Sequence, residues 1–115
     1  MTLVDTSIWI NFLRNREAQL RELLREGQVL MHPFVLGELL LGNVSSAAVP
    51  TFRSLPQAPV ASDREVQRLI EVRRLAGKGV GYVDVHLLAS ALMAGASLLT
   101  DDRRLRAIAS ELTII

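Results

Sequence analysis

The sequence predicts an α/β fold, in which a mainly parallel sheet of about five strands lies between two layers of helices. Strand-like segments are short, apolar and bounded by turn signals, and they fall at 2–4, 28–31, 58–61, 97–100 and 112–115. Longer segments with helical spacing of apolar residues separate them, which is typical of a parallel sheet covered on both faces. The 115 residues suit a single domain, 1–115, without an internal repeat.

Start and stop signals place the helices between these strands. Ser7, Pro33 and Ser62 are suited to helix starts, and Gly27 and Gly42 to helix ends. Helices are therefore expected at 8–24, 33–41, 63–75, from 84 onward, and in a short segment after 102. The segment 43–62 holds three of the four prolines, which predicts a loop or a short helix before the third strand.

Composition limits the classes of function. The chain contains no cysteine, which excludes disulfides, thiolate metal sites and cysteine nucleophiles together. No apolar run reaches the roughly 18 residues that span a bilayer, and the N-terminal segment lacks the features of a secretory signal. We therefore expect a cytoplasmic protein. Twelve of the thirteen basic residues are arginine, which suits phosphate recognition but is equally typical of a GC-rich genome.

Four acidic residues lie outside the charged helix surfaces that hold most of the others. Asp5 follows the first apolar segment, and Asp102 follows the fourth. Asp84 stands at a predicted helix start after the glycine-rich segment 77–81, which we interpret as a hinge or turn. Each aspartate alone is also well explained as a helix cap. Glu38 lies within an apolar helix, where a carboxylate must reach solvent or find a partner.

Taken together, the four carboxylates predict a metal site. Ligands of an open parallel sheet bind outside the carboxyl ends of the strands, where Asp5 and Asp102 fall. Clustered carboxylates repel one another, and a hard divalent cation such as Mg²⁺ or Mn²⁺ compensates their charge. Such an ion lowers the pKa of a bound water that can attack a phosphodiester. Nearby hydroxyls are expected to orient the carboxylates or metal-bound water, although Ser7 is equally suited to capping: Thr6, Ser7 and Thr100.

Several segments resemble the motifs of VapC-type PIN domains. The segment LVDTSIWI at 3–10, with Asn11 after it, closely resembles the opening of that family. The later motifs follow in the same order: Glu38 in its leucine-rich helix, VD at 83–84 followed by LLASA at 87–91, and TDDRRL at 100–105. The resemblance covers essentially the whole chain, and its first and last motifs are the most specific.

The resemblance implies a PIN fold, a three-layer α/β/α sandwich. It implies an endoribonuclease toxin that depends on Mg²⁺ or Mn²⁺, cleaves RNA phosphodiester bonds and is neutralised by a VapB-like antitoxin. It also implies a homodimer. Position by position, Asp5, Glu38, Asp84 and Asp102 correspond to the four acids of the family site, and Asp101 falls at a variable position. The chain is slightly short around 43–62, which is compatible with a lost helix there.

Arginines flank two of the four acids, and we expect them to contact RNA phosphates. Residues three apart on a helix project together, so Arg103 and Arg106 can act on the same side. The alternative is that these side chains are solvated and pair with nearby glutamates. The candidate RNA-binding residues are Arg73, Arg74, Arg103, Arg104 and Arg106.

Two other functions fit parts of the pattern. A non-catalytic regulator or binding module could have the same fold. An aspartyl-phosphate enzyme could use Asp5 as its nucleophile, but the dehalogenase pattern has a second aspartate where this chain has Ser7. A receiver domain has an early acid pair and a late lysine, whereas Asp101 and Asp102 come late and Lys78 is the only lysine.

Overall fold

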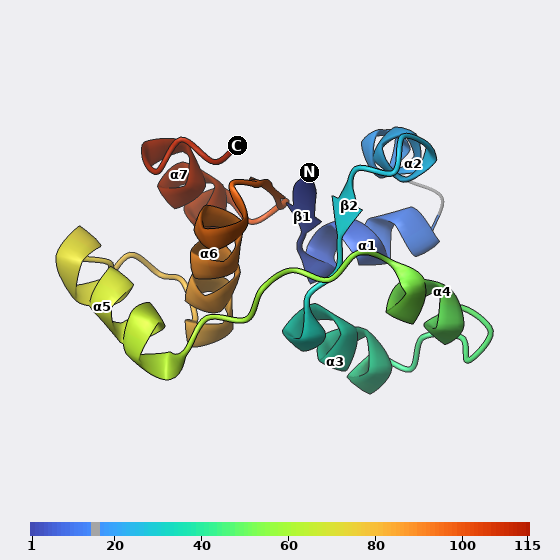
Figure 1. Cartoon of the computed structure of the whole chain (residues 1–115), viewed down its shortest axis with the longest axis horizontal. Helices are drawn as coiled ribbons and strands as arrows, with labels where there is room; N and C mark the ends of the chain where they lie inside the picture. The colour runs from blue at the N-terminus through green and yellow to red at the C-terminus, as the bar shows by residue number, and fades with distance from the viewer. Residues whose placement is uncertain (15–16) are drawn as a thin grey trace.

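The computed structural model describes residues 1–14 and 17–115, and Figure 1 shows the order of the elements along the chain. In this part of the chain the secondary structure runs β1 (Thr2–Val4), α1 (Thr6–Leu13), α2 (Ala18–Arg25), β2 (Val29–Leu30), α3 (Pro33–Leu41), α4 (Val49–Ser54), α5 (Asp63–Arg73), α6 (Tyr82–Ala94), β3 (Ser97–Leu99) and α7 (Arg103–Glu111). None of the described helices is long and apolar enough to cross a membrane.

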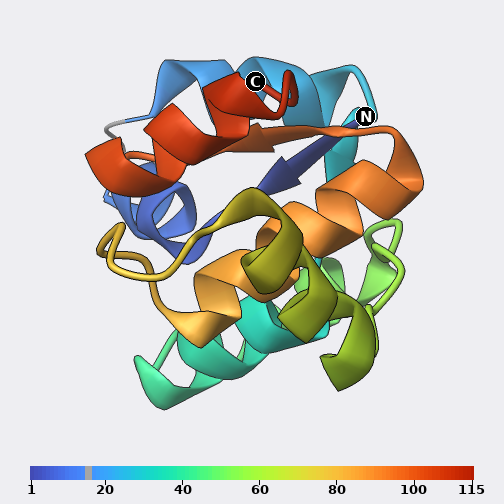
Figure 2. The same ribbon diagram turned by 90° about the vertical axis from the view of Figure 1, so that its left-hand side faces the viewer.

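A parallel sheet with the strand order β2-β1-β3 lies at the centre of the fold. Leu3 of β1 pairs with Leu30 on one side and with Leu98 on the other. Figure 2 shows helices on both sides of this sheet, with α2 and α7 above it and α3, α5 and α6 below. The α/β class and the parallel sheet predicted from the sequence are therefore confirmed.

Helix α6 forms the centre of the lower layer because it is apolar around most of its circumference. Seven successive residues, 85–91, are buried, and the helix packs against both β1 and β3. A helix that is apolar on all sides is typical of such a position. Gly95 ends α6 with a φ of 61°, in the left-handed region that favours glycine.

The prediction of about five strands is wrong, because the described residues form only three. The segment 58–61 begins to pair with the end of β2: the Ala58 N–H donates to the Met31 carbonyl, and the Met31 N–H donates to the Pro56 carbonyl. The next bond of this parallel ladder would need an N–H at position 33, but Pro33 has none and begins α3. The pairing therefore stops at a single bridge.

The predicted strand at 112–115 is also absent. The Leu98 N–H donates to the Ile114 carbonyl, so this segment does reach the edge of the sheet beside β3. However, Thr113 has a φ of 59°, which breaks the extended conformation, and the Ile114 N–H closes the end of α7 on Ala109. The backbone groups that a strand needs are thus already used by the helix end.

The predicted helices are confirmed with changed boundaries. The helix expected over 8–24 is two helices, α1 and α2, and residues 15–16 between them lie outside the described part. The proline-rich segment 43–62 contains the short helix α4. Helix α6 begins at Tyr82, two residues before Asp84, and Asp102 caps α7. Asp5, Asp84 and Asp102 therefore lie at helix starts, and Asp5 and Asp102 follow the carboxyl ends of β1 and β3.

Candidate active site

Asp5 occupies the centre of the candidate site, at the point where β1 ends. Its backbone N–H donates to the Leu99 carbonyl of β3, which ties it to the sheet. Its carboxylate accepts a hydrogen bond from the Thr6 N–H at 2.8 Å and caps α1. Only 8% of Asp5 is exposed. The end of β1 and the first turn of α1 therefore fix this carboxylate in one direction.

Two hydroxyl groups hold the second oxygen of the same carboxylate. Asp5 Oδ2 accepts from Ser7 Oγ at 3.0 Å and from Thr100 Oγ1 at 2.7 Å. Thr100 is buried at the end of β3, so its bond to Asp5 is shielded from water. Ser7 and Thr100 were expected to orient a carboxylate of the site, and that role requires hydrogen bonds of this kind.

Glu38 reaches the site from α3. Its side chain is exposed, and its Oε1 accepts a hydrogen bond from Thr6 Oγ1 at 2.7 Å. Thr6 thus contacts Asp5 through its backbone and Glu38 through its hydroxyl. A carboxylate in an apolar helix needs either water or a hydrogen-bond partner, and Glu38 has both.

Asp102 lies on the other side of Asp5 and is linked to it through Thr100. Its N–H donates to Thr100 Oγ1 at 3.1 Å, and the same hydroxyl donates to Asp5. Asp102 Oδ1 accepts from the N–H groups of Arg104 and Leu105 at the start of α7. The capping role considered from the sequence therefore holds, and it coexists with a position at the site.

Asp101 is held by a separate set of contacts. Its carboxylate accepts from Asn11 Nδ2 and lies 3.7 Å from Arg106, and its N–H donates to Ser7 Oγ. Asn11 appeared in the sequence only as part of a family motif, and no role was assigned to it there. Its contact shows that Asp101 fastens the turn after β3 to α1.

Asp84 completes the group from the first turn of α6. Its Oδ2 accepts from the Gly81 N–H at 3.0 Å. Burial raises the pKa of the Asp84 carboxyl, and the negative charges of Asp5, Asp102 and Glu38 raise it further, against the opposing effect of the Gly81 N–H. The structure therefore brings Asp5, Asp102 and Glu38 within electrostatic reach of Asp84.

The donor set suits a hard divalent cation. Within the described residues, no three histidine, aspartate or glutamate side chains lie close enough to form a ready-made metal centre. Mg²⁺ usually keeps several waters and needs only one or two carboxylates together with substrate phosphates. Asp5, with its neighbouring acids, supplies such oxygen ligands, so the residues fit the ion without a complete protein cage.

The candidate RNA-binding arginines differ in how they are held. Arg106 Nη2 donates to the Thr100 carbonyl at 2.8 Å, which commits part of its guanidinium to the turn after β3. Arg104 packs against Gly79: a Cβ at position 79 would lie 2.6 Å from Arg104 Cδ. Arg73 and Arg74 are exposed at the end of α5, and Arg103 is exposed on α7. Contact of any of them with RNA stays a prediction.

The family model of the PIN domain matches residues 2–111. The chain belongs to the PIN-domain family. It is 46% identical over 114 residues to a protein named Ribonuclease VapC32 from Mycobacterium tuberculosis strain CDC 1551 / Oshkosh, an alignment that covers 96% of this chain and 92% of the relative. The same values hold for Ribonuclease VapC32 of strain ATCC 25618 / H37Rv.

Proposed function

We propose that this protein is a VapC-type toxin, an endoribonuclease that hydrolyses RNA phosphodiester bonds with Mg²⁺ or Mn²⁺. The observation that carries the proposal is the electrostatic coupling of Asp84 with Asp5, Asp102 and Glu38, in a chain similar over 96% of its length to a named ribonuclease. Ribonucleases with PIN domains are in general metal-dependent.

The residues of the site divide into ligands and supports. Asp5, Glu38, Asp84 and Asp102 would hold the cation, which when bound lowers the pKa of a water and stabilises charge on the phosphate. Ser7 and Thr100 keep Asp5 in one orientation, and Thr6 does the same for Glu38. Burial and the neighbouring acids disfavour the charged form of Asp84, and a bound cation would compensate that charge.

The proposal includes a partner and a location. A VapB-like antitoxin neutralises the toxin in the cytoplasm, and the toxin forms a homodimer. Several large apolar side chains are exposed, including Leu41, Val72 and Ile115. Exposed apolar surface of this kind supports an interaction with another chain.

The test is incubation of the purified protein with labelled single-stranded RNA after removal of metal with EDTA. Cleavage is expected to be absent in EDTA and to return when Mn²⁺ or Mg²⁺ is added in excess of the chelator. RNA binding without cleavage under any of these conditions would favour the non-catalytic regulator. The same assay with double-stranded DNA separates a ribonuclease from a general phosphodiesterase.

Arg104 is the arginine whose replacement is expected to weaken RNA binding most clearly. Arg104→Ala removes a guanidinium that lies beside the loop at Gly79, and a lost phosphate contact lowers both affinity and salt dependence. The slope of log affinity against log salt should fall by about one unit, with cleavage recovering at high RNA concentration. Fluorescence anisotropy with labelled RNA over a salt series measures both quantities.

Two further variants make the Arg104 experiment specific. Gly79→Ala is expected to act in the same direction, because the added Cβ would displace the Arg104 side chain and the φ of 79° disfavours alanine. Arg64→Ala, an exposed arginine on α5, is the control and should leave affinity unchanged. If Arg104→Ala binds RNA with the affinity and salt slope of the original protein, RNA enters along another face.

A further inference from the structure

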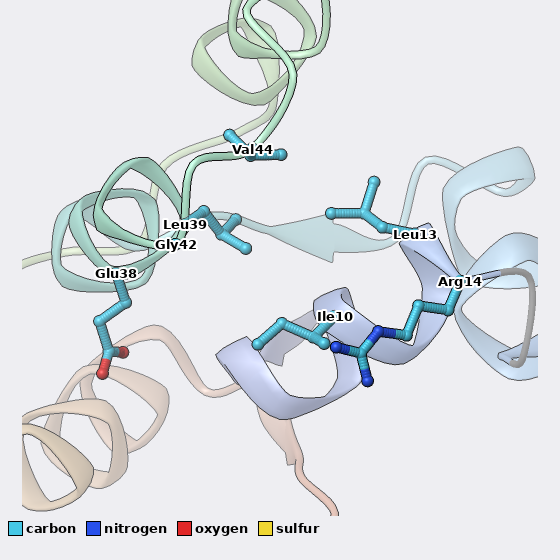
Figure 3. A pocket seen from close by; sticks show the side chains of 7 residues that line it. All are labelled: Ile10, Leu13, Arg14, Glu38, Leu39, Gly42 and Val44. Carbon is cyan, nitrogen blue, oxygen red and sulfur yellow. The ribbon is translucent and has the colours of Figure 1, made fainter.

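A small pocket adjoins the candidate active site between α1 and α3. Its volume is about 220 Å³, and it is lined by Ile10, Leu13, Arg14, Glu38, Leu39, Gly42 and Val44. In Figure 3, Ile10, Leu13 and Arg14 come from the α1 side, and Glu38 and Leu39 come from α3. Ile10 and Leu13 are 40% and 44% exposed, although both are large and apolar. The pocket is therefore an open apolar slot whose polar groups come from Arg14 and Glu38.

The slot is continuous with the acidic group. Thr6, Ile10 and Leu13 follow one another at spacings of four and three, so they lie on the same side of α1. Thr6 donates to Glu38, and Glu38 lines the slot. A molecule in the slot would thus lie directly beside the carboxylates that would hold the metal and the scissile phosphate.

We infer that this slot binds one unpaired base of the RNA, next to the phosphodiester bond that is cut, and that it prefers guanine. The inference rests on the proposed ribonuclease function and adds a specificity site to it. Pockets that take drug-sized ligands measure about 300–1,000 Å³, and a slot of 220 Å³ suits a single ring system. Sequence-specific recognition of RNA commonly places splayed-out bases in such pockets.

The lining distinguishes a base from a phosphate. The aliphatic side chains of Ile10, Leu13 and Leu39 can cover the faces of a planar ring, which gains from leaving water. A phosphate would lose its hydration among these aliphatic side chains, whereas a neutral base has little charge to desolvate. A cation held by the acidic group would take the phosphate, and the apolar slot beside α1 is left for the base.

Arg14 supplies the preference for guanine. Among the described residues, its guanidinium is exposed and makes no ion pair or hydrogen bond. Arginine donates two parallel hydrogen bonds to the adjacent acceptors O6 and N7 of guanine, and adenine has an amino donor in place of O6. An arginine at the rim of an apolar slot can therefore read this edge of the base.

The experiment uses a single-stranded RNA library that is randomised around the cut position. It compares how fast the full chain with Mn²⁺ cleaves the different sequences. The original protein should prefer guanine at one position next to the cleaved bond. Arg14→Ala should lower kcat/KM on the preferred RNA about tenfold and leave RNAs without that guanine unchanged. Leu13→Ser, which removes part of the wall at an exposed position, should also reduce the preference. Arg25→Ala, an exposed arginine paired with Glu22, is the matched control and should match the original protein.

The outcomes separate the inference from the function on which it rests. Absence of cleavage of any RNA with either metal overturns the proposed function itself. Cleavage without a base preference, or an equal loss on every RNA in Arg14→Ala, overturns the base slot and leaves the nuclease in place. Loss of antitoxin affinity in Arg14→Ala and Leu13→Ser, with the RNA preference unchanged, would show that the slot serves a protein partner and would overturn the base slot too.

Discussion

Asp5→Asn is expected to reduce RNA cleavage at least about 100-fold while the protein stays folded. Loss of one well-placed electrostatic group at an active site commonly lowers kcat by 10²–10³. Asp5 accepts hydrogen bonds from Thr6, Ser7 and Thr100, so it is the best-fixed carboxylate of the site. Asparagine has the same shape but no charge, so it is a weak ligand for a hard cation. Single-turnover cleavage of labelled RNA with saturating Mn²⁺ measures the loss.

The fold should tolerate this change because the neighbours of Asp5 can adapt. The asparagine oxygen can still accept from the Thr6 N–H, and its NH₂ group can donate to Ser7 Oγ or Thr100 Oγ1, whose hydroxyls rotate. Glu71→Gln on the exposed face of α5 removes one negative charge away from the site and is the control. A similar loss of cleavage in both variants would contradict a specific role for Asp5.

The free energy of unfolding is expected to fall on acidification because of His32. This residue is fully buried at the N-cap of α3, with Nδ1 accepting from the Phe34 N–H and Nε2 3.0 Å from Ser90 Oγ. Protonation would place a second donor opposite the Phe34 N–H. Burial, and in the same direction the nearby His86, lower the pKa of His32 from 6.5 to about 4. Folding thus selects the neutral ring.

The sign and size of the effect follow from proton linkage. Between pH 6.5 and 4 the unfolded chain binds a proton at His32 that the folded chain does not, so stability is greatest above pH 6.5 and falls toward pH 4. A shift of this size amounts to about 3 kcal/mol. Urea unfolding followed by circular dichroism at pH 7, 6, 5 and 4 measures the decline.

His32→Asn is the variant that isolates this contribution. Asparagine can cap α3 through its side-chain oxygen but does not titrate. The variant should start from a lower stability at pH 7, because the buried ring is lost, and should then decline less steeply with acid. If the two proteins lose the same free energy between pH 7 and pH 4, other groups cause the acid sensitivity.

The sequence predicted the parts of the fold that depend on local chemistry. Asp5 and Asp102 stand where an apolar strand meets a helix start, and this position alone predicts a strand end and a cap. The unusual place of Glu38 in an apolar helix predicted that it would need a partner. Its partner is Thr6, which the sequence assigned to the site without a specific contact.

The remaining features depend on long-range contacts that no local pattern encodes. The segments 58–61 and 112–115 have strand-like composition, yet Pro33 opposite the first segment and the left-handed Thr113 in the second prevent further pairing at the sheet. The contact between Gly79 and Arg104, and the slot beside Arg14, each join residues from different elements. Such contacts arise from the packing of helices, which residue spacing alone does not determine.

The most direct test of the central claim is titration of the metal-free protein with Mn²⁺ by isothermal titration calorimetry. The claim is that Asp5, Glu38, Asp84 and Asp102 form one cation site, so binding should be seen for the original protein and for Glu71→Gln. It should be at least about tenfold weaker for Asp5→Asn, since even supporting residues of metal sites commonly contribute that much. Equal Mn²⁺ affinity in Asp5→Asn and the original protein, or no binding by the original protein, would contradict the account.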